Sequence, residues 1–125
     1  MYQERLDFKQ HIHFLGVSYV SKFLDRVGFT IVEVNTDQNH HYQLFVKIHD
    51  KSFLIAVRTD YHPKLGTLDT CAMENLLRES EKLNALPHFA GLAVAPVDVN
   101  DNGQDGSSED HTLKVLFSGI RAIRR

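Results

Sequence analysis

The feature that most constrains the fold is a nearly uninterrupted apolar stretch, residues 89–97, which follows an amphipathic segment over residues 70–84. From Phe89 to Ala95 every residue is apolar or glycine, a pattern typical of a strand with both faces buried. Apolar positions in the preceding segment recur at helical spacing. The strand is therefore reached through a helix, and we expect it to lie parallel to a neighbouring strand in an α/β fold.

The other segments complete the order α-β-β-β-α-β-β. Apolar residues three or four apart predict a long first helix, and β-branched, alternating segments predict a three-stranded meander after it. Asp69 or Thr70 is the expected N-cap of the second helix, which Pro87 ends, and Pro96 ends the apolar strand. We expect one α/β domain, residues 1–125, with a mixed central sheet. The predicted helices span residues 7–27 and 70–84, and the predicted strands residues 30–34, 41–49, 52–59, 89–97 and 112–117.

One face of the first helix is predicted to pack against the sheet. Its residues share the helical spacing and are all apolar or aromatic. They are Phe8, Ile12, Leu15, Tyr19, Phe23 and Val27.

The net charge of the chain limits the kinds of binding partner that it can have. The 125 residues include 14 Lys and Arg against 16 Asp and Glu, a net charge of −2, which argues against a strongly basic nucleic-acid clamp. Five of the acidic residues lie in the polar stretch 98–110, so the rest of the chain carries 14 basic against 11 acidic side chains. We expect residues 98–111 to form a flexible acidic loop on a mildly basic body, which is compatible with modest nucleic-acid contact.

Cysteine content and hydropathy bear on the compartment. The single cysteine, Cys71, excludes an intrachain disulfide and a cysteine-rich zinc module and favours a reducing environment. No apolar run approaches the roughly 20 residues of a membrane span, and the first residues are too polar for a signal peptide. We therefore expect a cytoplasmic protein without membrane contact.

The element order, with Ile55-Ala56-Val57-Arg58-Thr59 as the third strand, resembles the core of the PD-(D/E)XK nuclease-like superfamily, which includes restriction endonucleases and Holliday-junction resolvases. The resemblance covers roughly residues 7–99 and rests on order and pattern. It implies a restriction endonuclease-like fold, with an aspartate on the second strand and a carboxylate, one residue and a lysine on the third. Arg58 stands in place of that lysine, Ala56 in place of the carboxylate, and Gln43 near the aspartate.

These departures decide which function the resemblance implies. The chemistry of the superfamily needs two carboxylates to hold a divalent metal such as Mg²⁺, and alanine cannot ligate it. Asp60 lies on the same strand face as Ala56 and Arg58, so a displaced carboxylate is the one route to a retained Mg²⁺-dependent nuclease. We expect instead a degenerate member with an eroded metal site, a nucleic-acid-associated or accessory protein that is not an enzyme and has no cofactor.

A second family has nearly the same element order. Type III secretion chaperone-like proteins are small, mildly acidic and dimeric, and they bind a peptide or a partner protein. The chain is similar to them in length and order, without a defining motif. This resemblance implies a protein partner or a homodimer and is the alternative to nucleic-acid binding.

The stretch after the apolar strand matches the calcium-loop pattern D-x-[DN]-x-[DN]-G-x5-E. Its oxygen ligands would be Asp98, Asn100, Asn102 and Glu109. A calcium loop of this type needs a helix on each side, whereas the flanking segments here are predicted strands. We therefore expect a polar loop without Ca²⁺.

Other side chains have a functional and a structural interpretation. Arg58 follows two apolar positions on its strand face, so it is either an arginine whose head reaches solvent or a bidentate contact for phosphate or carboxylate. His11 and His13, two residues apart on a helix, point to different faces and do not form a zinc pair. Cys71 at a helix start, with His62 nearby in sequence, lacks the third residue of a nucleophilic site.

Overall fold

A computed structural model describes residues 2–97 and 113–124, with side chains from residue 8 onward. The observed order is α-β-β-β-α-β-β, as predicted. The elements are α1 Tyr2–Arg26, β1 Thr30–Val34, β2 Leu44–Ile48, β3 Lys51–Tyr61, α2 Thr70–Leu83, β4 Leu86–Pro96 and β5 Leu113–Ala122. The acidic-loop prediction for residues 98–111 lies outside the described residues.

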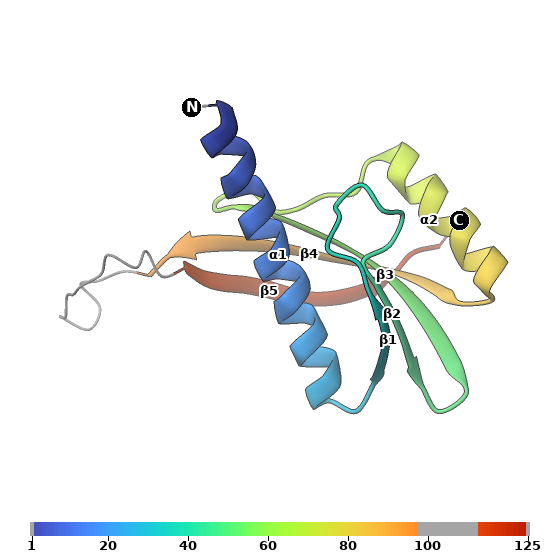
Figure 1. Cartoon of the computed structure of the whole chain (residues 1–125). Helices are drawn as coiled ribbons and strands as arrows, with labels where there is room; N and C mark the ends of the chain where they lie inside the picture. Colours follow the sequence, from blue (N-terminus) through green and yellow to red (C-terminus); the bar gives the residue numbers. More distant parts are fainter. Residues whose placement is uncertain (1, 98–112, 125) are drawn as a thin grey trace.

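The five strands form one mixed sheet in the order β1-β2-β3-β4-β5. Strands β1 to β3 are an antiparallel meander, and β5 is antiparallel to β4. β3 and β4 are parallel, with Arg58 opposite Gly91 in the register, and α2 makes the crossover between them. The parallel pairing predicted from the apolar stretch 89–97 is therefore confirmed (Figure 1).

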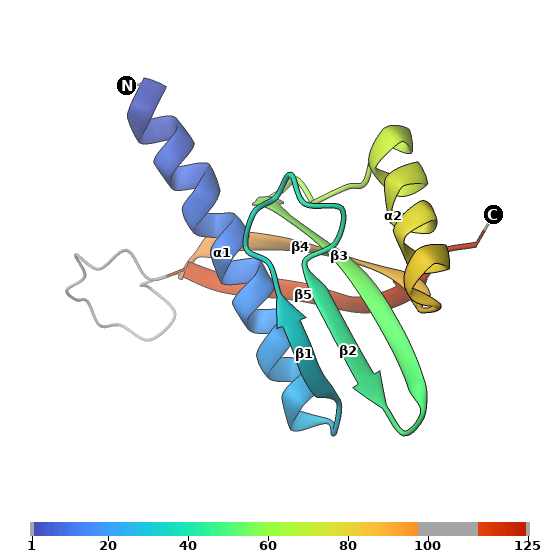
Figure 2. The same cartoon turned by 45° about the vertical axis from the view of Figure 1, so that its right-hand side comes forward.

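Each helix covers one face of the sheet (Figure 2). On β3, Ile55 and Val57 pack under α1, while Leu54 and Ala56 face α2. This alternation follows from the period of two in a strand, which sends successive side chains to opposite faces. Both faces of β3 and β4 are buried in consequence, as the continuous apolar sequence of β4 requires.

The face that α1 packs on the sheet differs from the predicted one. The predicted face includes Phe8 and Val27, which are 43% and 51% exposed. The buried face is rotated toward smaller residues because α1 lies close to β3, where a Cβ on Gly16 would overlap the Thr59 side chain. Bulky rings cannot enter so close a contact. The buried face consists of Ile12, His13, Gly16, Val17, Val20 and Leu24.

Several predicted boundaries were also displaced. The second helix ends at Leu83, where Asn84 takes the left-handed conformation, and Pro87 lies inside β4 instead of ending the helix. The β2–β3 turn is His49-Asp50, since Ile48 pairs with Lys51. The last strand extends to Ala122, past its predicted end. Asp69 is the N-cap of α2 and Pro96 the last residue of β4, as predicted.

No helix in the described part of the chain is long and apolar enough to cross a membrane.

Candidate functional site

Gln43 organises the polar end of the sheet. It lies just before β2, and its side chain is fully buried and makes four hydrogen bonds. Its Oε1 accepts from the Val57 backbone N–H at 2.8 Å and from Arg58 Nη1 at 3.0 Å. Its Nε2 donates to the carbonyl oxygens of Asp37 and His40, each at 3.1 Å. The amide therefore ties the loop between β1 and β2, residues 35–43, to strand β3.

Arg58 lies on β3, the central strand, and faces α2. Its Nη1 donates to Gln43 Oε1 and to the Val57 carbonyl, both at 3.0 Å. These bonds use both protons of Nη1, so the Nε proton and both Nη2 protons have no partner among the described residues. No Asp or Glu of that part of the chain forms an ion pair with Arg58.

The charge of Arg58 persists despite its surroundings. Partial burial lowers the pKa of the Arg58 guanidinium, and the Asp69 carboxylate counters this by favouring the charged form. An arginine remains protonated at neutral pH even when its pKa is lowered. The strand therefore presents a fixed cation with a free bidentate edge.

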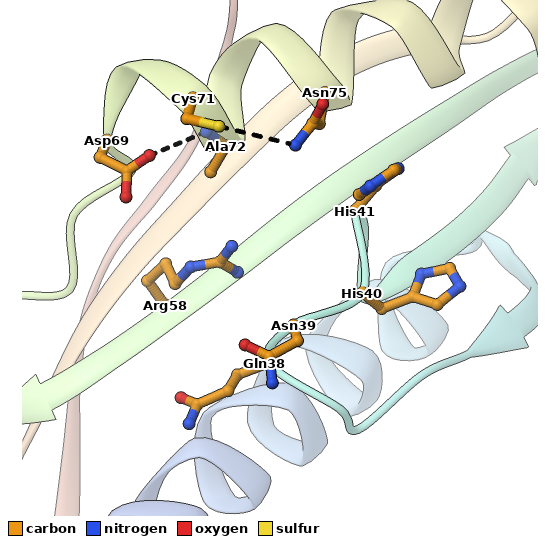
Figure 3. A pocket seen from close by; sticks show the side chains of 9 residues that line it. All are labelled: Gln38, Asn39, His40, His41, Arg58, Asp69, Cys71, Ala72 and Asn75. Atoms are coloured by element: carbon orange, nitrogen blue, oxygen red, sulfur yellow. Dashed lines mark hydrogen bonds between the residues drawn. The ribbon is translucent and has the colours of Figure 1, made fainter.

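A polar cavity of about 340 Å³ opens at Arg58, between the start of α2 and the β1–β2 loop (Figure 3). Four loop residues form one wall and four residues at the start of α2 form the other, with Arg58 between them. We name this cavity the Arg58 pocket. Its lining residues are Gln38, Asn39, His40, His41, Arg58, Asp69, Cys71, Ala72 and Asn75.

The segment before α2 is fitted tightly to the sheet at this level. The Gly66 N–H donates to the Leu92 carbonyl at 3.0 Å, and a Cβ on Gly66 would overlap the Arg58 backbone carbonyl. Only glycine allows this approach. Asp69 then begins the helix, with its Oδ1 accepting from the Ala72 N–H at 2.8 Å, a standard N-cap. Both the start of α2 and Arg58 are thereby held in place.

Of the three side chains singled out by the PD-(D/E)XK resemblance, two meet and one does not. Gln43 and Arg58 are hydrogen-bonded, whereas Asp60 lies two residues farther along β3 and outside the Arg58 pocket. The Oδ1 of Asp60 accepts from the Tyr61 backbone N–H at 2.7 Å. Asp60 therefore does not supply the carboxylate that the position of Ala56 lacks.

The side chains at this place do not fit the Mg²⁺ that the resemblance implies. Oε1 of Gln43, the side chain near the position of the expected aspartate, already accepts two hydrogen bonds, and Arg58 places a positive charge beside it. Mg²⁺ binds carboxylate and carbonyl oxygens and is repelled by a neighbouring cation. Among the described residues, no group of three or more His, Cys, Asp or Glu is placed to hold a metal. The calcium candidates Asp98, Asn100, Asn102 and Glu109 lie outside the described residues.

Sequence reasoning missed a second cavity on the α1 side of the same loop. This cavity, of about 430 Å³, is lined by Gln10, His13, Phe14, Thr36, Asp37, Gln38 and Asn39. His13 is only 3% exposed, and its Nε2 has no hydrogen-bond partner in the described part of the chain. Burial lowers the pKa of His13, and the charge of Arg58 lowers it further, while Asp37 acts in the opposite direction. The two histidines of α1 thus differ as predicted, with His11 exposed.

Comparison with known protein families now gives one finding. A family model described as a domain of unknown function, DUF8840, matches residues 10–123. The chain belongs to the DUF8840 family. The matched residues begin inside α1 and end just after β5, so they cover most of α1, the six other elements and the lining residues of both cavities. A search of curated proteins found no match.

Proposed function

We propose that this DUF8840 domain is a nucleic-acid-associated accessory protein that binds phosphate at Arg58 without cleaving the strand. The observation that carries the proposal is the Arg58 guanidinium, which faces a polar pocket with three N–H donors that have no partner within residues 2–97 and 113–124. A guanidinium edge of this kind matches two oxygens of a phosphate. The surrounding amides and histidines add donors without adding a competing carboxylate, apart from Asp69, whose Oδ1 caps α2.

The architecture supports a degenerate PD-(D/E)XK relationship. The order of the elements, the meander and the helical crossover between parallel strands fit the core order of that superfamily. The positions of Gln43 and Arg58 converge on one place, as two positions of one former site would. An amide near the position of the aspartate, and an arginine in place of the lysine, favour phosphate binding over metal-assisted hydrolysis.

The charge of the chain and its expected compartment both fit weak binding of nucleic acid. Outside residues 98–110 the chain carries 14 basic and 11 acidic side chains, which favours weak, salt-dependent contact over tight clamping. The exposed free thiol of Cys71 fits the reducing cytoplasm, where we expect this binding to take place.

Fluorescence anisotropy with a labelled DNA duplex tests the phosphate contact. We expect binding that weakens as salt rises from about 50 to 200 mM. Arg58→Ala should weaken it about tenfold or more, because a hydrogen bond to a charged group is lost. Arg58→Lys should fall between, since lysine keeps the charge and loses the fork. Arg26→Ala is the matched control, an exposed arginine at the far end of α1. Equal affinities for the Arg58→Ala and Arg26→Ala proteins would refute the proposal.

Two further measurements separate the other functions. Plasmid or branched DNA incubated with Mg²⁺ or Mn²⁺ should stay intact, and cleavage that is lost in Asp60→Ala and Arg58→Ala would make the protein a nuclease instead. Size-exclusion chromatography tests the chaperone-like alternative. That alternative is less favoured because β4 is a buried strand parallel to β3, and a stable dimer indifferent to DNA would support it.

A further inference from the structure

The cavity beside α1 has the chemistry of a site for a flat heteroaromatic group. Phe14 lines the cavity and is 50% exposed, so part of an aromatic ring is open to a ligand. Around the ring stand three amides, a hydroxyl, an imidazole and a carboxylate, which supply both donors and acceptors. We name this cavity the Phe14 pocket. A nucleobase has the matching form, because it stacks on an aromatic ring and forms hydrogen bonds along its edge.

One of the side chains that line the Phe14 pocket is a buried histidine. His13 lines it, is 97% buried by its 3% exposure, and has no partner for its Nε2 among the described residues. Buried polar groups are normally hydrogen-bonded, and an exception marks a functional or water-filled position. The lowered pKa of His13 keeps the ring neutral near pH 7, so one nitrogen donates and the other accepts.

The Phe14 pocket adjoins the Arg58 pocket. Gln38 and Asn39 line both cavities, so the β1–β2 loop is the wall between them. That wall is fixed from inside, because Gln43 Nε2 donates to the Asp37 carbonyl at 3.1 Å and the Asn39 N–H donates to Asp37 Oδ1 at 2.9 Å. A preorganised wall lowers the entropy cost of binding a ligand on both sides of it.

We propose that the Phe14 pocket takes one unstacked base of a single-stranded nucleic acid whose phosphate is held by Arg58. A strand that crosses the β1–β2 loop places a phosphate on one side and a base on the other. A duplex keeps its bases paired and stacked, so it engages the Arg58 pocket alone. This inference rests on the proposed function and adds to it a preference for single-stranded or locally unpaired nucleic acid.

The chain contains no tryptophan, which provides a direct optical test. Phe14→Trp introduces a single fluorophore into the pocket and keeps an aromatic face there. Titration with an unlabelled single-stranded oligonucleotide of about 12 nucleotides should quench its fluorescence as a base stacks on it. Phe8→Trp is the matched control, because Phe8 lies on the same helix, is 43% exposed and lies outside the pocket. We expect no quenching in that protein.

Affinities measured by anisotropy separate the two proposals. Phe14→Ala should weaken binding of the single strand about fivefold or more and leave duplex binding unchanged, and Arg58→Ala should weaken both. Circular dichroism confirms that each variant is folded, which we expect because Phe14 is half exposed. If Arg58→Ala weakens binding while Phe14→Ala does not, the base pocket is wrong and the phosphate site stands. If Arg58→Ala has no effect on either ligand, the proposed function fails and this inference fails with it.

Discussion

Replacing Gln43 by methionine removes the hydrogen bonds that join the β1–β2 loop to β3 while keeping a side chain of similar volume. The side chain is fully buried, and the substitution leaves the Val57 N–H without an acceptor. An unsatisfied buried donor costs about 1–3 kcal/mol. The two bonds to the carbonyls of Asp37 and His40 contribute about 0.5–1.5 kcal/mol each. We therefore expect Gln43→Met to lower the free energy of unfolding by about 2–6 kcal/mol.

Urea denaturation followed by circular dichroism measures this change. Typical domains are stable by only about 5–15 kcal/mol, so the expected loss is a large shift of the midpoint. Gln10→Met is the control, because Gln10 is exposed on α1 and a surface substitution changes stability by about 0.5 kcal/mol or less. A loss below about 1 kcal/mol in Gln43→Met would refute the reasoning, since the loop would then be held without the amide.

Three further predictions follow from single side chains. A Cβ at Gly66 would overlap the backbone of Arg58, so Gly66→Ala should lower the free energy of unfolding, measured in urea, by about 1–3 kcal/mol and weaken nucleic-acid binding. Gly28 has a φ of 109° but open space around it. Gly28→Ala should therefore lower the free energy of unfolding by about 1 kcal/mol and leave binding unchanged. Burial lowers the pKa of His13, so the unfolded chain takes up a proton at this residue more readily than the folded protein. The free energy of unfolding should therefore fall by up to about 1 kcal/mol as pH drops from about 7.5 to 5.5. His13→Gln should reduce this dependence on pH, and His11→Gln should not. Burial and a hydrogen bond to a β1 carboxylate raise the pKa of Tyr42 to about 12. Its contribution to stability should therefore be lost as pH rises above about 10. In an absorbance titration, Tyr42→Phe should lack a tyrosine ionisation at a pH of about 12 that the unsubstituted protein shows.

The sequence predicted the fold well where one period dominates. The continuous apolar stretch of β4 has one solution, a strand with both faces covered, and this determined the parallel pairing with β3. The first helix was harder because it carries apolar residues on two sides. Its small residues pack on the centre of the sheet, while Tyr19 and Phe23 make edge-to-face contacts with Phe117 of the edge strand β5, with ring centroids 5.5 and 5.3 Å apart. Periodicity cannot tell these two contacts apart, so the aromatic stripe was mistaken for the core face.

The candidate site was predictable only in part. Gln43 and Arg58 were identified from the sequence because the resemblance assigns both positions to one site. The sequence of Asp37, Gln38 and Asn39 indicates only a turn. These residues become candidates only because two cavities lie on either side of their loop. A local sequence pattern does not predict where two cavities adjoin.

The pairing of a neutral amide with Arg58 supports the proposal that the site binds an external anion. A carboxylate at position 43 would form an ion pair with Arg58 and cancel its charge. The neutral Oε1 of Gln43 instead accepts one hydrogen bond from Arg58 Nη1 at 3.0 Å, which fixes the direction of the guanidinium and leaves its charge intact. The same amide fixes the loop that separates the two pockets. One buried side chain thus orients the proposed phosphate contact and builds the wall of the proposed base pocket, so we expect substitutions at position 43 to affect both.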